Sequence, residues 1–116
     1  MKSSILLTKS KAFALRIVRL YKYLRERKES VVAKQMLRSG TSIGSNIAES
    51  RYAQSKSDFA SKLQIALKEA AETEYWLELL RDGELVAPSS AFDTLLADCT
   101  ELIKLLTASV KTTKGS

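Results

Sequence analysis

Apolar residues recur every three or four positions through most of this 116-residue chain, which is the period of amphipathic helices. The spacing predicts helices over residues 8–28, 31–53, 57–82 and 89–111. Their apolar stripes are Phe13, Ile17, Leu20 and Leu24; Ala33, Met36, Gly40, Ile43 and Ile47; Phe59, Leu63, Ala66, Ala70 and Leu77, with Thr73 in register; and Phe92, Leu96, Cys99, Ile103, Leu106 and Val110. Short connections between long helices make neighbours antiparallel. The predicted fold class is all-α: an antiparallel up-down-up-down four-helix bundle, forming a single domain over residues 1–116 with a frayed tail from Lys111.

Residues that start or stop helices fall at the predicted ends. The candidate N-caps are Thr8, Ser30 and Ser55, the last with Asp58 in capping-box spacing. Gly83 follows the third helix and can take the left-handed conformation that ends many helices. Pro88 fits the first turn of the fourth helix, where its missing N–H does no harm.

The composition excludes several classes of site. The chain has no histidine and one cysteine, so Ser-His or Cys-His catalysis, an internal disulfide and a structural zinc site are excluded. Cys99 falls on an apolar stripe, and we interpret it as a core residue rather than a nucleophile. No secretion signal opens the chain and no apolar run is long enough to span a bilayer, so we expect a cytoplasmic protein that binds no membrane. Because no such site is evident in the sequence, we also expect no cofactor, metal or small-molecule substrate.

The net charge of +6 is unevenly distributed. Residues 1–51 hold 12 lysines and arginines against three acids, whereas residues 52–116 hold seven against ten. A basic surface on the first two helices suggests an anionic partner, above all nucleic acid. Charge pairing between basic and acidic helices is an equally open interpretation of this pattern.

The stretch RSGTSIGSNIAES, residues 38–50, has the composition of a phosphate-binding loop. It lacks the lysine that follows the second glycine of a P-loop, and the pattern before it is helical rather than a strand. The apolar period runs straight through its glycines, so a helix is predicted. Gly40, Gly44 and Ala48 then form a ridge of small residues that would let another helix approach closely.

Some predicted outer faces also hold unusual residues. Arg38, Ser42, Ser45 and Glu49, with Thr41 beside them, lie opposite the core of the second helix. Four large apolar residues point away from their own stripes: Leu15, Val18, Trp76 and Leu105. Exposed apolar patches usually mark interfaces, so a homo-oligomer is predicted.

Asn46 lies beside the core stripe of the second helix, and Glu74 falls on the core side of the third. A buried carboxylate needs a partner or a proton. The candidate partners are Asn46, Arg38, Arg51 and Arg81. Glu74 could be a catalytic acid, but without a cooperating group we favour a polar layer that fixes helix register or subunit contact. Glu69, Glu72 and Glu78 are interpreted as solvated or interface charges rather than metal ligands.

Four segments resemble a known family: KSKAFALRIVRLYKYL, KQMLRSGTSIGSNIAES, SKSDFASKLQIALKEAAETEYWLELL and LIKLLTASVKT. The chain is similar over nearly its whole length to the four-helix-bundle 23S rRNA intervening-sequence proteins. The most specific motif, R-S-x-x-S-I-x-x-N-I-A-E, is met by Arg38, Ser39, Ser42, Ile43, Asn46, Ile47, Ala48 and Glu49, and a later E-x-E by Glu72 and Glu74. Ser50 stands where many members have glycine, which would let the second helix run longer.

The resemblance implies a left-handed up-down bundle that assembles as a homopentamer. It also implies a relationship to the accessory variability determinant proteins of diversity-generating retroelements, which are basic pentamers that bind nucleic acid and a reverse transcriptase. No catalytic activity is attached to either group. The residues expected to serve packing and assembly are Arg38, Gly40, Ser42, Gly44, Asn46, Ala48, Glu49, Glu72, Glu74 and Trp76.

The leading hypothesis is therefore a non-enzymatic homopentamer that binds RNA or DNA. The expected contacts are Lys11, Arg19, Lys22, Arg25, Arg27, Lys28 and Lys34. Binding would be to phosphates, salt-dependent and weakly sequence-specific, since no reading helix or aromatic platform is evident. The alternative is a protein-interaction scaffold that docks a partner such as a reverse transcriptase, with nucleic-acid contact secondary.

Overall fold

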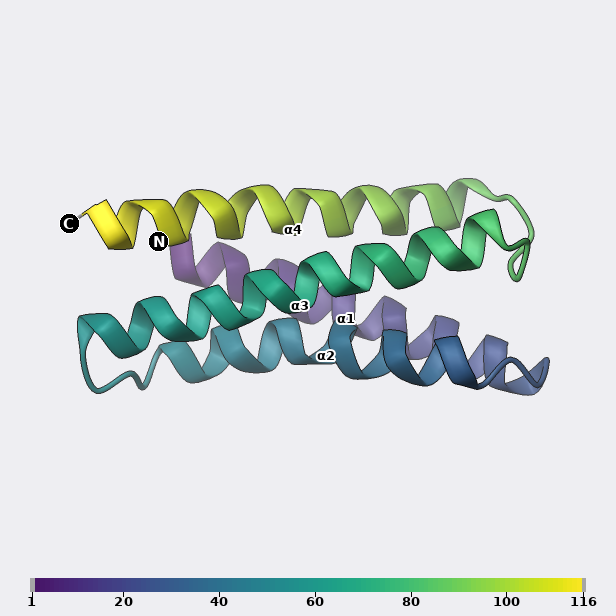
Figure 1. Cartoon of the computed structure of the whole chain (residues 1–116), viewed down its shortest axis with the longest axis horizontal. Coiled ribbons are helices and arrows are strands. Elements are labelled where there is room, and N and C mark those ends of the chain that lie inside the picture. Colours follow the sequence, from purple (N-terminus) through teal and green to yellow (C-terminus); the bar gives the residue numbers. More distant parts are fainter. Residues whose placement is uncertain (1, 116) are drawn as a thin grey trace.

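Four long helices make up the described part of the chain (Figure 1). The computed structural model describes residues 2–115, with side chains described for residues 5–113. The helices are α1 (Lys2–Glu26), α2 (Val31–Ser50), α3 (Lys56–Asp82) and α4 (Ser90–Gly115). Among the described residues there is no strand, which confirms the all-α prediction.

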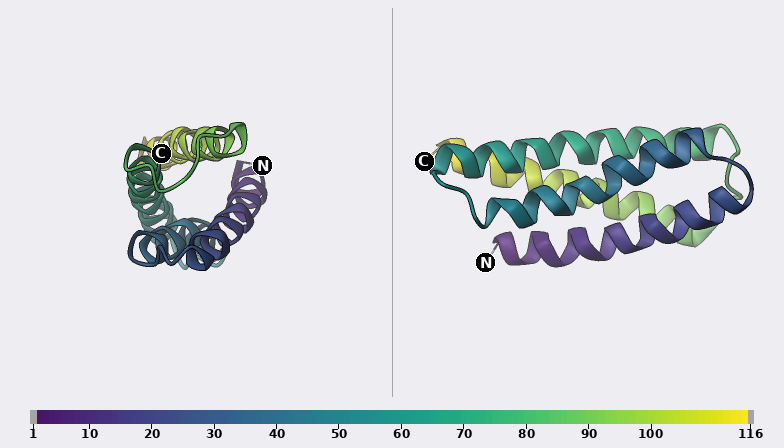
Figure 2. Two further views of the ribbon diagram at one scale, coloured as in Figure 1. Left: turned by 90° about the vertical axis from the view of Figure 1, so that its right-hand side faces the viewer. Right: turned by 90° about the horizontal axis from the view of Figure 1, so that it is seen from below.

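Successive helices run in opposite directions along one long axis, so the two ends of the described chain lie at the same end of the molecule (Figures 1 and 2). Each helix packs against two neighbours, in the cyclic order α1, α2, α3, α4. The seam between α1 and α4 is the least closely packed of the four. This rod measures 46 × 21 × 19 Å.

The core follows the predicted stripe completely on α2, whereas Leu20 of α1 and Phe59 of α3 are only half-buried and the stripe of α4 differs further. Phe13, Ile17, Met36, Ile43 and Leu77 are all essentially inaccessible to solvent. The other buried apolar residues are Leu6, Leu24, Ala33, Ile47, Leu63, Ala66, Ala70, Leu80, Phe92, Leu95, Cys99, Leu102, Leu106 and Val110. The prediction placed Leu96 and Ile103 in the stripe of α4, but these two are only half-buried.

The error in the stripe of α4 has a geometric cause. Leu95 and Leu96 are adjacent apolar residues, as are Leu102 and Ile103, and each pair spans about 100° of the helix circumference. Either member continues the apolar period, so the sequence does not choose between them. Packing in the bundle buries Leu95 and Leu102.

The start of α1 was also predicted wrongly. The helix begins at Lys2, and Thr8 is an exposed residue within it rather than its cap. Leu6 is only 2% exposed and lies with Leu105 and Ala108 of α4 along the α1–α4 seam. Packing of Leu6 against α4 therefore favours a helix that starts before the capping signal.

Capping differs between the other three helix starts. Ser55 caps α3 as predicted, because its Oγ accepts a hydrogen bond from Asp58 N at 3.0 Å. Ser30 occupies the N-cap position of α2 without a side-chain hydrogen bond. At α4, Ser89 is the capping residue, since its Oγ accepts from Phe92 N at 3.0 Å, and Pro88 lies outside the helix.

Two helices end at positions other than those predicted: α2 is shorter than expected and α4 is longer. α2 ends at Ser50 instead of continuing to residue 53, and Ser50 is buried with its hydroxyl donating to Ile47 O at 2.6 Å. The expectation that a serine here would lengthen the helix is therefore wrong. The tail predicted to fray after Lys111 is helical as far as Gly115.

Left-handed residues end α1 and α3, but neither is glycine. Lys28 has φ of 67° and Glu84 has φ of 59°, whereas Gly83 has φ of −83°, so the expectation of a left-handed Gly83 is wrong. Glu84 N donates to Arg81 O at 3.1 Å and Leu85 N donates to Leu80 O at 2.9 Å. These are the two hydrogen bonds of a Schellman motif with Glu84 as its left-handed residue.

Replacing Glu84 by glycine is expected to raise the free energy of unfolding by about 1 kcal/mol, because a Cβ atom is unfavourable in this conformation. Thermal unfolding followed by circular dichroism measures the change. Glu84→Ala is the control, since alanine keeps the Cβ atom and removes only the carboxylate. Equal stabilisation by alanine would show that charge, not backbone conformation, is responsible.

The small residues of α2 face α1. A Cβ atom built on Gly40 would lie 2.9 Å from Ile17 Cγ2, and one on Gly44 would lie 3.4 Å from Ser10 Oγ. Ser10 and Gly40 are both buried at this contact. The ridge of Gly40 and Gly44 thus brings the α1 and α2 backbones close together within one chain.

Candidate nucleic-acid interface

Seven exposed cations lie on α1, on the turn after it and at the start of α2, and together they are called the basic face. It consists of Lys11, Arg19, Lys22 and Arg25 on α1, Arg27 and Lys28 in the turn after it, and Lys34 in the first turns of α2. All seven residues are exposed. None of them forms an ion pair with another side chain within the described range 5–113. Their positive charges therefore remain available to a partner.

The remaining cations of α1 with described side chains face α4 and are used within the fold. Arg16 Nη1 lies 2.7 Å from Asp98 Oδ2, and Lys9 Nζ lies 3.3 Å from Glu101 Oε1. Both pairs cross the α1–α4 seam. The charge-pairing interpretation of the sequence is thus correct for these two residues and does not account for the basic face.

Two tyrosines hold arginines of the basic face. The Arg27 guanidinium carbon lies 4.3 Å from the Tyr23 ring centroid, and that of Arg25 lies 5.8 Å from the Tyr21 ring centroid. Cation–π contact restricts the arginine while leaving its N–H groups free to donate at the edge of the plane. The sequence shows Tyr21 and Tyr23 interleaved with these charges and favours a packing role for both, but Tyr23 is 39% exposed at the basic face.

Apolar residues lie among these cations. Leu15 is 50% exposed and Val18 is 37% exposed, as predicted. Trp76 and Leu105 were predicted to point outward as well, but both are half-buried and pack against the core. Helical geometry alone misplaced them, because large side chains at the flank of a stripe can fold back over the seam between helices.

One turn after Lys34 on the same helix, Arg38 joins α2 to α3. Its Nη1 lies 3.1 Å from Glu69 Oε2, and its Nη2 binds Glu72, which also accepts from Trp76 Nε1 at 2.9 Å. The hydrogen bonds from Arg38 and then from Trp76 hold the pKa of Glu72 below its ordinary value. Arg38 is thus the partner of these two glutamates and not of Glu74.

The polar layer predicted between Asn46 and Glu74 does not form. Asn46 Nδ2 donates to Ser42 O within α2 at 2.8 Å, and Glu74 Oε2 accepts from Thr100 Oγ1 of α4 at 3.1 Å. The polar pair that is fully buried consists of Thr73 and Ser39, whose hydroxyl oxygens are 2.7 Å apart. The clue in the sequence was Thr73, which lies in register with the apolar stripe of α3.

Comparison with known proteins shows the family of this chain. The sequence profile of the 23S rRNA-intervening sequence proteins matches residues 2–108. The chain belongs to this family. It is similar to a protein of unknown function from the S23 ribosomal protein family of Bacteroides thetaiotaomicron, with 54% sequence identity, a TM-score of 0.89, and coverage of 96% of this chain and 99% of that chain. No curated protein matches it.

The motif of this intervening-sequence family member has structural roles in the monomer. Arg38 and Glu49 bind α3, the latter through Lys62 Nζ at 3.0 Å. Ser39 packs in the core, and Ser42 Oγ donates to Ser39 O at 3.0 Å. Hydroxyls bonded to carbonyls of their own helix leave fewer donors that need water, which suits a helix rich in serine.

Neither a cluster of metal ligands nor a helix able to cross a membrane is found among the described residues. No three Asp, Glu, Cys or His side chains in that part of the chain are grouped to hold a metal ion. In the same range, no helix has the length and apolar content that crossing a membrane needs. Cys99 is buried, and its Sγ lies 3.4 Å from Ala70 O.

Cys99 is expected to resist alkylation while the protein is folded. Burial, with Glu74 and Glu78 nearby, raises the pKa of the thiol to about 12, so roughly one in ten thousand is thiolate at pH 8. Iodoacetamide at pH 8 should leave the native protein unmodified and label it fully in denaturant, as read by intact mass. Rapid labelling without denaturant would contradict the core assignment.

Proposed function

We propose that this protein is a non-enzymatic, homo-oligomeric nucleic-acid-binding protein whose contact surface is the basic face. The observation that supports this proposal most strongly is the division of the cations of α1. Lys9 and Arg16 are paired with α4, whereas Lys11, Arg19 and Lys22 are exposed without an ion pair to any described side chain. A row of unneutralised cations on one helix fits the phosphate backbone of a nucleic acid.

The chemistry of the basic face favours affinity over sequence specificity. Lysine and arginine bind phosphates by releasing condensed counterions, and this contribution does not depend on sequence. Asn46, the single asparagine of the chain, is not part of the basic face, and its Nδ2 donates to Ser42 O of its own helix. We therefore expect strong salt dependence and little preference among sequences.

Oligomer formation is supported by apolar residues on two outer faces. Leu15 and Val18 are exposed on α1, and Ile65, Tyr75 and Leu79 are 37–54% exposed on α3. Burial of such residues is a common reason for subunit association. The family resemblance suggests five copies, which would repeat the basic face around a ring.

A role without catalysis is supported by the chemistry of the individual residues. The single cysteine is buried and its pKa is raised, and the chain contains no histidine. Glu74 is occupied by Thr100, and Glu72 by Arg38 and Trp76. Binding of a macromolecule is therefore the function that these side chains fit best.

Titration of the protein into labelled structured RNA and duplex DNA tests the proposal. We expect binding to both at about 50 mM salt and much weaker binding at about 200 mM salt, as phosphate contacts require. Absence of binding at the lower salt concentration would overturn the nucleic-acid proposal. Sedimentation velocity tests assembly, and a monomer at micromolar concentration would overturn that part.

A protein-docking scaffold is the second candidate. The exposed residues Ile65, Tyr75 and Leu79 on α3 favour it, because they lie away from the basic face and could contact a partner enzyme such as a reverse transcriptase. If the chain assembles but does not bind RNA or DNA at low salt, this second function would replace the first.

A further inference from the structure

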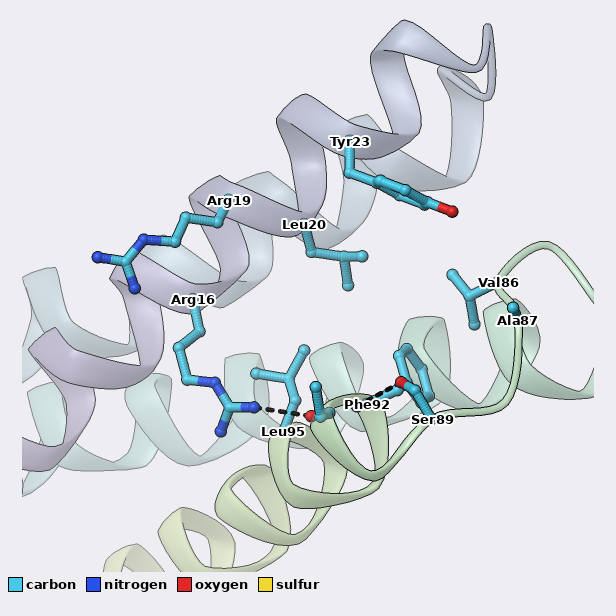
Figure 3. A pocket seen from close by; sticks show the side chains of 10 residues that line it. Arg16, Arg19, Leu20, Tyr23, Val86, Ala87, Ser89, Phe92 and Leu95 are labelled. Atoms are coloured by element: carbon cyan, nitrogen blue, oxygen red, sulfur yellow. Dashed lines mark hydrogen bonds between the residues drawn. The ribbon is translucent and has the colours of Figure 1, made fainter.

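A groove of about 420 Å³ lies between the second half of α1, the connection 83–89 and the start of α4 (Figure 3). Its floor is apolar and consists of Leu20, Val86, Phe92 and Leu95. Phe92 and Leu95 are 7% and 4% exposed, so the floor is continuous with the core. The volume is within the range of pockets that bind small organic groups.

Arg16 fixes the edge of this groove that α4 provides. Its guanidinium donates to Asp98 Oδ2 at 2.7 Å, to Ala91 O at 2.7 Å and to Thr94 Oγ1 at 2.9 Å. Three hydrogen bonds to one helix hold α1 and α4 at a fixed separation here. The groove is therefore a preformed feature of the seam.

Tyr23 and Arg19 form the opposite, outer edge. The Tyr23 ring extends from α1 toward Val86, while the Arg19 side chain points away from the floor (Figure 3). Arg27 stacks on the Tyr23 ring at 4.3 Å. An apolar floor is thus bordered by an exposed aromatic ring and by Arg19, with Arg27 stacked on that ring, and neither arginine has an ion pair among the described side chains.

We propose that this groove binds an unstacked nucleobase of single-stranded RNA or DNA, with the adjacent phosphates on Arg19 and Arg27. The proposal rests on the proposed function and deepens it by naming the form of nucleic acid that binds best. A base turned out of its strand can enter the groove and stack on Tyr23, whereas a base held in a duplex cannot reach the floor.

Charge and position favour this occupant over a neutral apolar peptide. Arg19 belongs both to the groove and to the basic face, so a strand bound along α1 passes the mouth of the groove. Aromatic and arginine side chains together form the usual stacking surface for bases. Asp98, the carboxylate that Arg16 binds beside this edge, is paired with that arginine at 2.7 Å.

The test compares a fluorescein-labelled single-stranded RNA with a blunt duplex of the same length, by anisotropy at one salt concentration. The key variant is Ala87→Trp, since Ala87 is an exposed residue of the groove and a larger side chain there fills the groove without changing charge. Its matched control is Ala97→Trp, at an exposed position of α4 outside the groove.

Wild-type protein should bind the single strand more tightly than the duplex. Ala87→Trp should weaken single-strand binding about tenfold and change duplex binding less than about twofold, in line with the loss of one stacked base. Tyr23→Leu should act in the same direction, and Ala97→Trp should act on neither. A 2-aminopurine in the strand should lose emission on binding the wild type and keep it with Ala87→Trp.

Each other outcome overturns a distinct statement. Equal binding of strand and duplex by the wild type, or equal weakening of both by Ala87→Trp, would reject the base site while the proposed function stands. A change of oligomer mass in Ala87→Trp would show that the groove accepts a second copy of the chain instead. Failure of the wild type to bind either ligand at low salt would reject the proposed function itself.

Discussion

Gly40→Leu is expected to destabilise the bundle by about 3 kcal/mol or more, a large fraction of the stability of a small domain. A Cβ atom at residue 40 would already lie 2.9 and 3.0 Å from two carbons of Ile17. Ile17 is fully buried, so relieving this overlap requires neighbouring core side chains to shift. The remaining atoms of leucine would force α1 and α2 apart, and urea unfolding followed by circular dichroism measures the loss.

Gly44→Ala provides the matched control, because Gly44 is also on α2 and also packs against α1. Here the nearest atoms belong to Ser10, at 3.4 and 3.6 Å, which is ordinary contact. Alanine gains up to about 1 kcal/mol of helix propensity over glycine, so this variant should be slightly more stable than the wild type. Gly40→Ala should instead be less stable, despite the same gain in propensity.

Ile17→Ala tests whether the clash is the cause. Combined with Gly40→Ala, it removes the two nearest carbon atoms that the new Cβ would meet, so the two losses should be less than additive. Strict additivity in this double-mutant cycle, or unchanged stability of Gly40→Leu, would show that the α1–α2 contact does not depend on the absence of a side chain at residue 40.

Hydrophobic period predicted the existence and order of the helices well, and it failed where two solutions fit equally. On α2 the stripe is bordered by serine and threonine, so only one face is apolar and all five predicted residues are buried. On α4, the adjacent apolar pairs Leu95–Leu96 and Leu102–Ile103 leave open which side of the helix faces the core. Only the three-dimensional packing decides which of Leu95 and Leu96 is buried more deeply.

Helix ends were less predictable because local signals compete with burial. Thr8 is a residue type that often caps helices, yet burial of Leu6 against α4 extends α1 to Lys2. At the end of α3, Gly83 marked the right position, but the left-handed conformation falls on Glu84. A Schellman motif is defined by which carbonyls its N–H groups reach, and sequence alone does not contain that information.

The candidate interface was predictable in part. Counting the charges of residues 1–51 located the basic half, but it did not show that Lys9 and Arg16 have partners about 80 to 90 residues away on α4. The groove was invisible for the same reason, since Tyr23 and Val86 meet only once the bundle is closed. Contacts between residues far apart in the sequence can be identified only once the fold is known.

The triple variant Arg19→Glu, Lys22→Glu, Arg25→Glu is expected to weaken binding to duplex DNA at about 0.1 M salt by about a hundredfold or more. All three residues are exposed on α1 and none has an ion pair among the described side chains, so the fold should be unaffected. Each lost phosphate contact should also lower the slope of log affinity against log salt by about 0.9, or by about three in total. Anisotropy titrations over a series of salt concentrations measure both quantities.

A second triple variant has the same change in net charge but a different location. Lys56→Glu, Lys68→Glu, Lys104→Glu reverses exposed lysines of α3 and α4. If binding is localised on the basic face, this control should keep most of the affinity and nearly the full salt slope. Equal losses in the two variants would mean that nucleic acid responds only to total charge, in which case the division of α1 into paired and unpaired cations has no functional meaning.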